Sequence, residues 1–389
     1  MSRKTVAVVT TSRADYGLLH RTMRAIAEHP ELRLRVIACG SHLDAGRGMT
    51  VREIERDGFR VDARVASAPR GDDAAAVARA LGPAATGFAA AYRRLKPDLL
   101  LVLGDRWELL AACSAAVAAG VPIAHLHGGE SSEGVIDEQV RHAVTKMSQL
   151  HFPAAAAYRR RILQMGEDPR RVVLVGAPGI ENLRHLRRAP RADLERLVGL
   201  DLDRPFAVAT CHPETAGEVG LSVVDAALGA LDAVGIAAVV TLAGADAGGA
   251  AINRRARAWA ASRPGRAALA PSLGRVGYPS LVSLASAVIG NSSSGIIEAP
   301  SLRVPTVNIG DRQKGRLRAS SVIDARPTAA AAAAALRRAL SPAFRRRCDG
   351  SNPYDGGASS ARIVAAIARA LRDPRLPFKS FRDLPGRFG

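Results

Sequence analysis

Aromatic residues are scarce in this chain of 389 residues, and the scarcity bears on how its large positive charge is interpreted. The formal net charge is +19, and nearly all of the cations are arginines. Such a charge is typical of nucleic-acid binders, which also need aromatic side chains to stack on bases. Here the aromatics make up 4% of the residues, and the arginines are spread along the chain in segments such as RRLK, YRRRI and FRRRC. We therefore expect no nucleic-acid partner, and a basic surface that favours anionic substrates.

Cysteine and long apolar runs are also lacking. Cys39, Cys113, Cys211 and Cys348 lie far apart, in no paired or metal-ligand spacing, so we expect reduced thiols. No stretch of about 18 uninterrupted apolar residues is present, as a membrane-spanning helix would require. The first residues, MSRKTVAVVTTSRADYG, lack an apolar segment long enough for a signal peptide. These observations predict a cytoplasmic protein with no membrane partner.

Apolar runs of strand length alternate with helical patterns along nearly the whole chain. Strands that are continuously apolar belong to parallel sheets covered on both faces. Two such series predict an α/β fold with two Rossmann-like doubly wound domains facing a cleft. The expected helix at 74–95 carries a Pro/Gly interruption. The expected strands cover residues 5–11, 32–40, 98–105, 122–129 and 172–178 in the first half, and 206–213, 236–244, 267–271, 286–293 and 305–311 in the second.

The polar stretch LRHLRRAPRADLERL separates the two series and sets the predicted domain boundary. We expect an N-terminal domain over 1–185 and a C-terminal domain over 186–358. A helix and tail over 359–389 are expected to pack across both domains. Ligands of such sheets bind beyond the carboxyl ends of the strands, so the motifs at those ends are the candidates for function.

The segment GNSSSGIIEAP at 290–300 joins an expected strand to an expected helix. Helix N–H groups and serine hydroxyls converge there and suit a phosphate, while Glu298 suits ribose hydroxyls. The alternative is that Ser and Asn merely cap the helix.

Two further strand ends carry an arginine. TSRADYG places Arg13 and Gly17 at a strand-to-helix turn, where the arginine can hold a phosphate, or where Asp15 simply caps the helix. GDRWE places Asp105 as a candidate base and Arg106 as an anion ligand, or the two form a surface pair.

The densest cluster is HLHGGESSEGVIDEQVRH at 125–142. Histidines and carboxylates at this density indicate proton transfer or a metal site. His125 and His127 alternate on the expected strand, so Glu130 would complete a metal triad in the second case. We prefer proton transfer and expect no metal. In TCHPET, His212 ends a strand of the second half, where a backbone-satisfied histidine is the alternative.

Together these motifs resemble the sugar-nucleotide 2-epimerase family, especially its hydrolysing branch of the sialic or legionaminic acid type. The resemblance is carried in family order by SRADYGLL, GDRWE, HLHGGESSEGVIDEQVRHAVTKMS, CHPET and GNSSSGIIEAPSLRVPTVNIGDRQKGR. It implies a fold similar to GT-B glycosyltransferases and a homodimer. It also implies a UDP-sugar substrate and no metal or redox cofactor.

The chemistry that the resemblance implies starts with removal of the C2 proton of UDP-N-acetylglucosamine or a close UDP-2-acetamido sugar. UDP then leaves, and water adds to the glycal to release an N-acetylmannosamine-type sugar. A UDP-2,4-diacetamido-2,4,6-trideoxyhexose is the alternative substrate. The implied acid–base residues are Asp105, Glu130 and Asp137, with His127 as a possible proton donor and His212 serving the leaving diphosphate or the acetamido group. The implied substrate-binding residues are Arg13, Gly17, Arg106, Arg141, His142, Ser292, Ser293, Ser294, Gly295, Glu298 and Arg316.

The sequence departs from the family in two regions. Some relatives carry Glu where His127 stands, in HIEGGE-like segments, so the implied proton donor is either Glu130 or His127. Relatives often have Pro-Asn in the segment TLAGADAGG, where Ala243 and Gly244 stand here, so base recognition is left open. A GT-B glycosyltransferase remains the second enzyme class, although transfer to an acceptor needs no base at C2.

Overall fold

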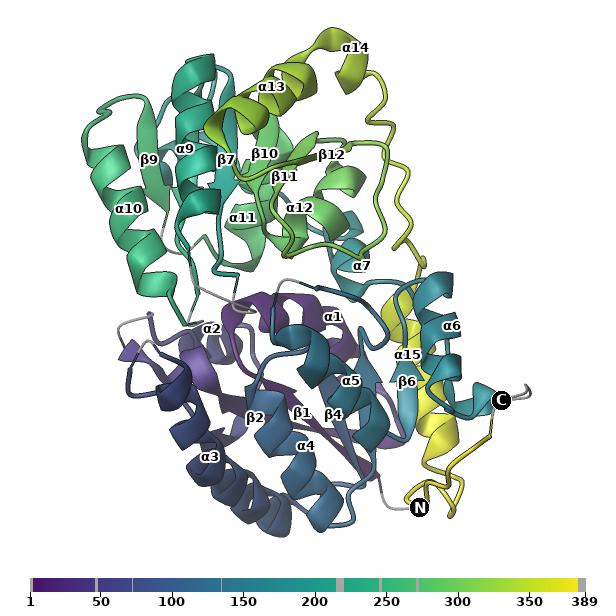
Figure 1. Cartoon of the computed structure of the whole chain (residues 1–389). Coiled ribbons are helices and arrows are strands. Elements are labelled where there is room, and N and C mark those ends of the chain that lie inside the picture. Colours follow the sequence, from purple (N-terminus) through teal and green to yellow (C-terminus); the bar gives the residue numbers. More distant parts are fainter. Residues whose placement is uncertain are drawn as a thin grey trace, which may run out of the picture.

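The first half of the chain folds around a six-stranded parallel sheet in this computed structural model (Figure 1). The structure describes residues 3–45, 48–71, 73–133, 135–214, 220–244, 247–270 and 273–383. The strands lie in the order β3-β2-β1-β4-β5-β6. Their bounds are β1 (Lys4–Thr10), β2 (Leu32–Cys39), β3 (Val61–Val65), β4 (Leu99–Leu103), β5 (Ile123–Leu126) and β6 (Leu150–Phe152).

Helices cover both faces of this sheet. They are α1 (Arg13–Glu28), α2 (Val51–Arg56), α3 (Ala74–Leu95), α4 (Glu108–Ala118), α5 (Asp137–Met147), α6 (Ala156–Gln164) and α7 (Pro178–Arg184), with short 3₁₀ helices η1 (Gly40–Leu43) and η3 (Pro169–Arg171).

A second parallel sheet repeats the same topology, with the order β12-β11-β10-β7-β8-β9. Its strands are β7 (Phe206–Thr210), β8 (Ala237–Thr241), β9 (Ala267–Ala270), β10 (Ala287–Gly290), β11 (Thr306–Ile309) and β12 (Val322–Ala325). The remaining helices are α8 (Arg191–Val198), α9 (Ser222–Val234), α10 (Gly249–Ala261), α11 (Gly274–Leu284), α12 (Ser293–Ile297), η4 (Ala299–Leu302), α13 (Ala329–Leu340), α14 (Pro342–Arg345) and α15 (Ser359–Ala370).

The central strands are apolar on both faces because each face meets its own layer of helices. In β1, Val6 and Val8 belong to the core shared with α1 and α15, whereas Ala7 and Val9 belong to the core shared with α3 and α4. Successive side chains of a strand point to opposite faces, so a continuous apolar run fills two cores at once. The predicted α/β fold with two doubly wound domains is confirmed.

The sequence analysis did not predict the short strands β3, β6 and β12, and one strand that it predicted is wrong. The segment at 172–178 makes only a single bridge, from Val172 to His151, and β6 is instead the last strand of the first sheet. β3, β6 and β12 are edge strands of three to five residues. Such segments are too short to show a period-two pattern.

Helix α3 corrects a second expectation, because it runs without a break through Gly82 and Pro83. Proline removes one backbone hydrogen bond and crowds the preceding turn. The buried side chains of Ala84, Phe88 and Tyr92 hold the rest of the helix against the sheet. Packing therefore outweighs the local preference.

Helix α15 returns the chain to the first domain (yellow in Figure 1). It packs against α1 and α7, and Ile363, Val364 and Ile367 enter the core that contains Val6. We keep residue 185, just after α7, as the proposed domain boundary. Among the described residues, no helix combines the length and apolar character needed to cross a bilayer.

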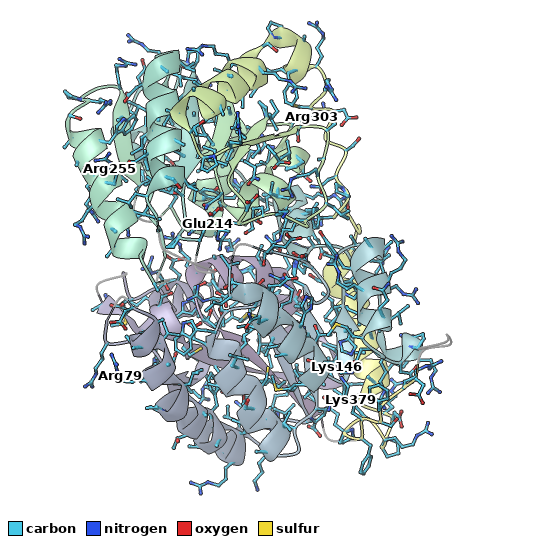
Figure 2. The ribbon with its side chains drawn as sticks, in the orientation of Figure 1. Arg79, Lys146, Glu214, Arg255, Arg303 and Lys379 are labelled. Carbon is cyan, nitrogen blue, oxygen red and sulfur yellow. The ribbon has the colours of Figure 1, made fainter. Side chains whose placement is uncertain are left out.

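The arginines project from many separate elements. Arg79 on α3, Arg255 on α10 and Arg303 after η4 lie on different parts of the surface (Figure 2). This distribution matches the spread of arginine along the sequence.

Candidate functional site

The carboxyl ends of strands from both sheets face one cleft of about 1760 Å³. This is where open parallel sheets bind their ligands. The first domain lines it with residues after β1, β4 and β5, and the second with residues after β7, β8, β10 and β11. The predicted site residues that line the cleft are Arg13, Gly17, Asp105, Arg106, His127, Glu130, Asp137, His212, Ser292, Ser293, Ser294, Glu298 and Arg316.

Arg141, one turn into α5, organises the acidic side of the cleft from beneath. Its side chain is fully buried, and both Nε and Nη2 donate to Oδ2 of Asp105, Nε over 3.0 Å. Nη1 donates to the Glu130 carbonyl at 3.1 Å and to Glu138 Oε2 at 2.8 Å. A guanidinium with this many acceptors is held in one orientation. Arg141 therefore supports the site through the residues that line it.

Asp105 is strongly biased toward its ionised form. Burial alone would raise the pKa of this carboxyl, but Arg141 and Arg316 outweigh burial and lower it to about 2. Asp105 follows β4, where the chain leaves the sheet at Gly104. A carboxylate with such a pKa is a weak base near neutrality and a strong partner for positive charge.

Arg316 comes from the loop after β11 and reaches across to the first domain. Its Nε lies 3.2 Å from Glu130 Oε2, and its Nη2 lies 3.9 Å from Asp105 Oδ2. Burial would raise the pKa of Glu130, but Arg316 and His127 lower it. Arg316 of the second domain thus faces two carboxylates of the first.

His127 and Glu130 form a hydrogen-bonded pair at the start of the HGGE loop. His127 Nδ1 lies 2.5 Å from Glu130 Oε1, and both side chains are more than nine-tenths buried. His127 has a φ of +64°, a left-handed conformation that is costly for a side chain of this kind. Within the described residues, its Nε2 is buried without a hydrogen-bond partner. That nitrogen is available to exchange a proton with a ligand in the cleft.

Asp137, the first residue of α5, faces Arg312 from the second domain. The distance from Arg312 Nη2 to Asp137 Oδ2 is 3.9 Å. Asp137 and Arg312 both line the cleft, so they form a second charge pair between the two domains. His142, on the same helix, does not line the cleft and bonds Glu138 at 3.0 Å.

The backbone of His212 is held in place by the side chain of a neighbouring asparagine. The fully buried Asn291 accepts from the His212 backbone N–H at 2.7 Å and donates to its carbonyl at 2.9 Å. The ends of β7 and β10 are thereby tied together. The histidine lines the cleft from the second domain, opposite the carboxylates.

The serines after β10 stand at the start of the short helix α12. Ser292 caps it by accepting from the Ser294 N–H at 3.4 Å. Gly295 does not line the cleft; a Cβ there would lie 2.8 Å from Thr306 Cγ2, so the glycine lets α12 pack on β11. Burial raises the pKa of Glu298, which suits a carboxyl that exchanges hydrogen bonds with neutral hydroxyls.

At the end of β1, both readings of the sequence describe part of the structure. Ser12 is the N-cap of α1, and Asp15 completes the capping box by accepting from the backbone N–H groups of Thr11 and Ser12, each at 2.6 Å. Arg13 still lines the cleft beside Gly17. Arg106 lines it as well and donates to the buried Glu108 through two bonds of 3.2 Å.

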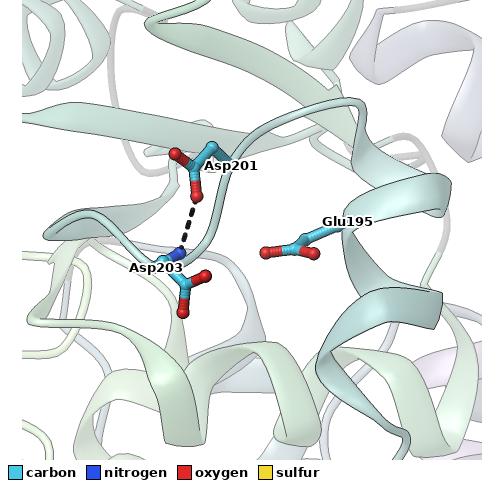
Figure 3. Close-up of side chains that lie close together, drawn as sticks. All are labelled: Glu195, Asp201 and Asp203. Carbon is cyan, nitrogen blue, oxygen red and sulfur yellow. Dashed lines mark hydrogen bonds between the residues drawn. The ribbon is translucent and has the colours of Figure 1, made fainter.

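The predicted alternative of a metal triad does not form in the described residues. His125 donates from Nε2 to the Gly104 carbonyl at 2.7 Å, and its Nδ1 contacts Thr145 Oγ1 at 3.2 Å. His127 instead leaves the strand and turns to Glu130. In the part of the chain that the structure describes, three potential ligand atoms come within 4.8 Å of one another at Glu195, Asp201 and Asp203 alone (Figure 3). Glu195 lies on α8 and the two aspartates on the exposed loop that follows it, and none of the three lines the cleft.

Sequence reasoning missed three residues of the second domain. Arg312 lines the cleft and, with Gln313, donates to the carbonyl of Asn291. Glu214 (labelled in Figure 2) accepts from the backbone N–H of Arg312 and so holds this loop. Arg312 and Gln313 stand in the motif GDRQKGR, and Asn291 in GNSSSG, so the motifs carried the signal although the individual side chains did not.

Comparison with known proteins identifies a family. A family model described as UDP-N-acetylglucosamine 2-epimerase matches residues 24–368. This match confirms the resemblance that the motifs indicated. The GDP/UDP-N,N'-diacetylbacillosamine 2-epimerase (hydrolyzing) of Campylobacter jejuni is 36% identical over 326 residues, covering 83% of this chain and 85% of that protein. The UDP-N,N'-diacetylbacillosamine 2-epimerase (hydrolyzing) of Legionella pneumophila is 34% identical over 372 residues, covering 94% and 96%.

Solved structures agree on the fold. The UDP-GlcNAc 2-epimerase of Neisseria meningitidis bound to UDP-GlcNAc matches with a TM-score of 0.79 and 16% identity, over 94% of this chain and 100% of that one. At this identity the likeness shows the fold alone. The arrangement of two Rossmann-like domains is GT-B-like, as the resemblance implied.

Proposed function

Because the chain belongs to the UDP-N-acetylglucosamine 2-epimerase family, we propose that it is a hydrolysing 2-epimerase of a UDP-linked 2-acetamido sugar. The observation that carries this proposal is the shared cleft. Carboxylates of the first domain face arginines, serines and a histidine of the second. The reaction removes a proton from C2 of the sugar and releases a diphosphate from C1. It therefore needs both sets of groups within the length of one sugar.

UDP-N,N'-diacetylbacillosamine, a 2,4-diacetamido-2,4,6-trideoxyhexose, is the substrate that we place first. The relatives from C. jejuni and L. pneumophila, both above 30% identity over most of the chain, carry the name of this sugar. UDP-N-acetylglucosamine is the second candidate, because the family model bears its name.

The proposed reaction has two steps. A base removes the proton at C2, the C1–C2 double bond forms, and the C1–O bond breaks with its electrons leaving on the UDP oxygen. Water then adds its oxygen to C1 of the glycal, and a proton reaches C2 on the opposite face. The products are UDP and the free sugar with inverted configuration at C2.

The residues fit this sequence of steps in different ways. Asp105, with its pKa of about 2, supplies negative charge near the reacting carbons and anchors Arg316. The His127–Glu130 pair and Asp137 are the candidates for proton transfer, and the free Nε2 of His127 is the atom through which that pair would act. His212, Arg316 and the serines after β10 would hold the diphosphate, with Glu298 at the ribose.

Incubation with a panel of UDP-sugars tests the proposal directly. UDP release and the free sugar are followed by NMR, without any acceptor. In D₂O, the product should carry deuterium at C2, because the original proton is lost in the elimination. Retention of that proton would rule out the mechanism. Release of no free sugar from any UDP-sugar in the panel, with transfer seen only when an acceptor is added, would favour a glycosyltransferase instead.

A further inference from the structure

Gln313 is a buried amide that lies between the ends of two strands and the cation that crosses the cleft. It is 1% exposed. Its Nε2 donates to the Asn291 carbonyl at 2.9 Å, and its Oε1 accepts from Arg316 Nη1 at 2.7 Å. We infer that Gln313 is a positioning residue, which fixes the Arg316 guanidinium against the carboxylates of the first domain. The kinetic part of this inference rests on the proposed function.

The anchor to which Gln313 is attached is rigid. Asn291 is fully buried at the end of β10, and its side chain is hydrogen-bonded to both backbone groups of His212 at the end of β7. The Asn291 carbonyl also accepts from Arg312 Nη1 at 3.2 Å. Because the carbonyl only accepts, the Gln313 amide must present its nitrogen there and its oxygen to Arg316. The orientation of the amide is thus determined by its partners.

The cation on the other side of Gln313 needs such a support. An arginine side chain has many rotamers and loses this freedom when it is held in one geometry. With Nη1 bonded to Gln313, the other two guanidinium nitrogens face the first domain. Nε of Arg316 lies 3.2 Å from Glu130 Oε2, and Nη2 lies 3.9 Å from Asp105 Oδ2. Among the described residues, the bond to Gln313 is the contact through which the second domain holds the Arg316 guanidinium.

The placement of Arg316 has a consequence for the ionisation of Glu130. An opposite charge within about 4–6 Å lowers the pKa of a carboxyl by about 1–3 units. Displacement of the guanidinium should therefore raise the pKa of Glu130. The titratable and charged groups that act on Glu130 or share its partners are His127, Arg141, Arg316, Tyr158, Tyr354 and Asp105.

A double-mutant cycle with Gln313→Leu and Arg316→Ala tests the inference. The acid limb of the kcat/KM profile reports ionisation in the free enzyme. Removing Arg316 should move this limb upward by about 1–3 pH units. Gln313→Leu should move it in the same direction, and the double variant should move it no further than Arg316→Ala alone. Gln313→Met fills similar space and replaces the leucine variant if that one does not fold.

Asn308→Leu is the matched control, because Asn308 is a buried amide on β11 whose amide donates to Asp324 at 2.7 Å. It should lose stability and leave the acid limb in place. If Gln313→Leu also loses stability without moving the acid limb, or if its shift adds to that of Arg316→Ala, the inference is wrong.

If the wild type turns over no UDP-sugar, the proposed function fails. Urea unfolding of the wild type, the two single variants and the double variant then decides about Gln313. A coupling between Gln313 and Arg316 would then support positioning, and additive losses would overturn it.

Discussion

Arg141 Nε and Nη2 both donate to a single carboxylate oxygen, Oδ2 of Asp105, beneath the floor of the cleft. Asp105 follows β4 and Arg141 lies on α5, so the pair joins two elements that lie next to each other only in the folded chain. Since Arg141 is fully buried, breaking this pair should cost more free energy of unfolding than breaking one of the many arginine pairs on the surface.

Replacing Arg141 with Leu should lower the free energy of unfolding by about 3–5 kcal/mol at pH 7, because the partly buried carboxylates of Asp105 and Glu138 lose a fully buried partner. Denaturant unfolding measures the change. Arg255→Ala is the control, since Arg255 pairs with Asp225 at 2.6 Å on the surface and should cost no more than about 1 kcal/mol. Equal losses for the two variants would contradict the central role of Arg141.

Asp105→Asn, Glu130→Gln and Asp137→Asn should each reduce turnover while leaving UDP binding measurable. Each keeps the shape of the side chain and removes its charge. Positioned acid–base groups typically contribute about 10²–10⁴-fold in rate, which is the scale expected for Glu130 and Asp137. Asp105→Asn instead removes the negative charge that anchors Arg316. Steady-state kinetics and calorimetry with UDP measure the two quantities. Glu133→Gln, an exposed acid of the same segment that pairs with Lys314, should change neither. Normal turnover in the three variants would remove these residues from the proposed mechanism.

Arg316→Ala should weaken UDP binding by about 1.5–3 kcal/mol, the range for a hydrogen bond to a charged group. The expected loss reflects a direct contact of Arg316 with the diphosphate in the complex. Calorimetry measures the affinity. Lys314→Ala controls for the loss of one positive charge from the same loop, because Lys314 is exposed and pairs with Glu133 at 2.9 Å. Unchanged affinity in Arg316→Ala would assign the diphosphate to other residues.

Acidification should destabilise the protein well above the pH at which its carboxylates titrate. Burial lowers the pKa of His125 to about 3, whereas the same side chain titrates near 6.5 in an unfolded chain. Between these values the unfolded chain binds the extra proton, so stability falls as pH falls, by about 1.4 kcal/mol per pH unit for one proton.

His125→Asn should flatten this slope between pH 6.5 and 4, even if the variant is less stable at pH 7. Urea unfolding at several pH values gives the slope. An identical slope in the variant would show that His125 does not titrate in this way. Below pH 4, Asp105 and Glu138 add a second loss, because the folded pKa of each lies at about 2.

The sequence alone determined the class of fold and the segments that carry function. Buried strands such as β4 are apolar throughout and lie between helical patterns, so a local window contains the information. The strand ends could be located in the same way, and with them Asp105, Glu130, His212 and Ser293. The edge strands β3, β6 and β12 were missed because a few residues do not define a period.

Only the tertiary structure decided which of these residues meet. Arg316, which the resemblance implied as a substrate-binding residue, also lies 3.2 Å from Glu130, and this pairing depends on how the two sheets face each other. The turn of His127 toward Glu130 depends on a left-handed backbone conformation that strand periodicity does not predict. Contacts between segments far apart in the chain follow from the packing of whole domains, so no local window of sequence contains them.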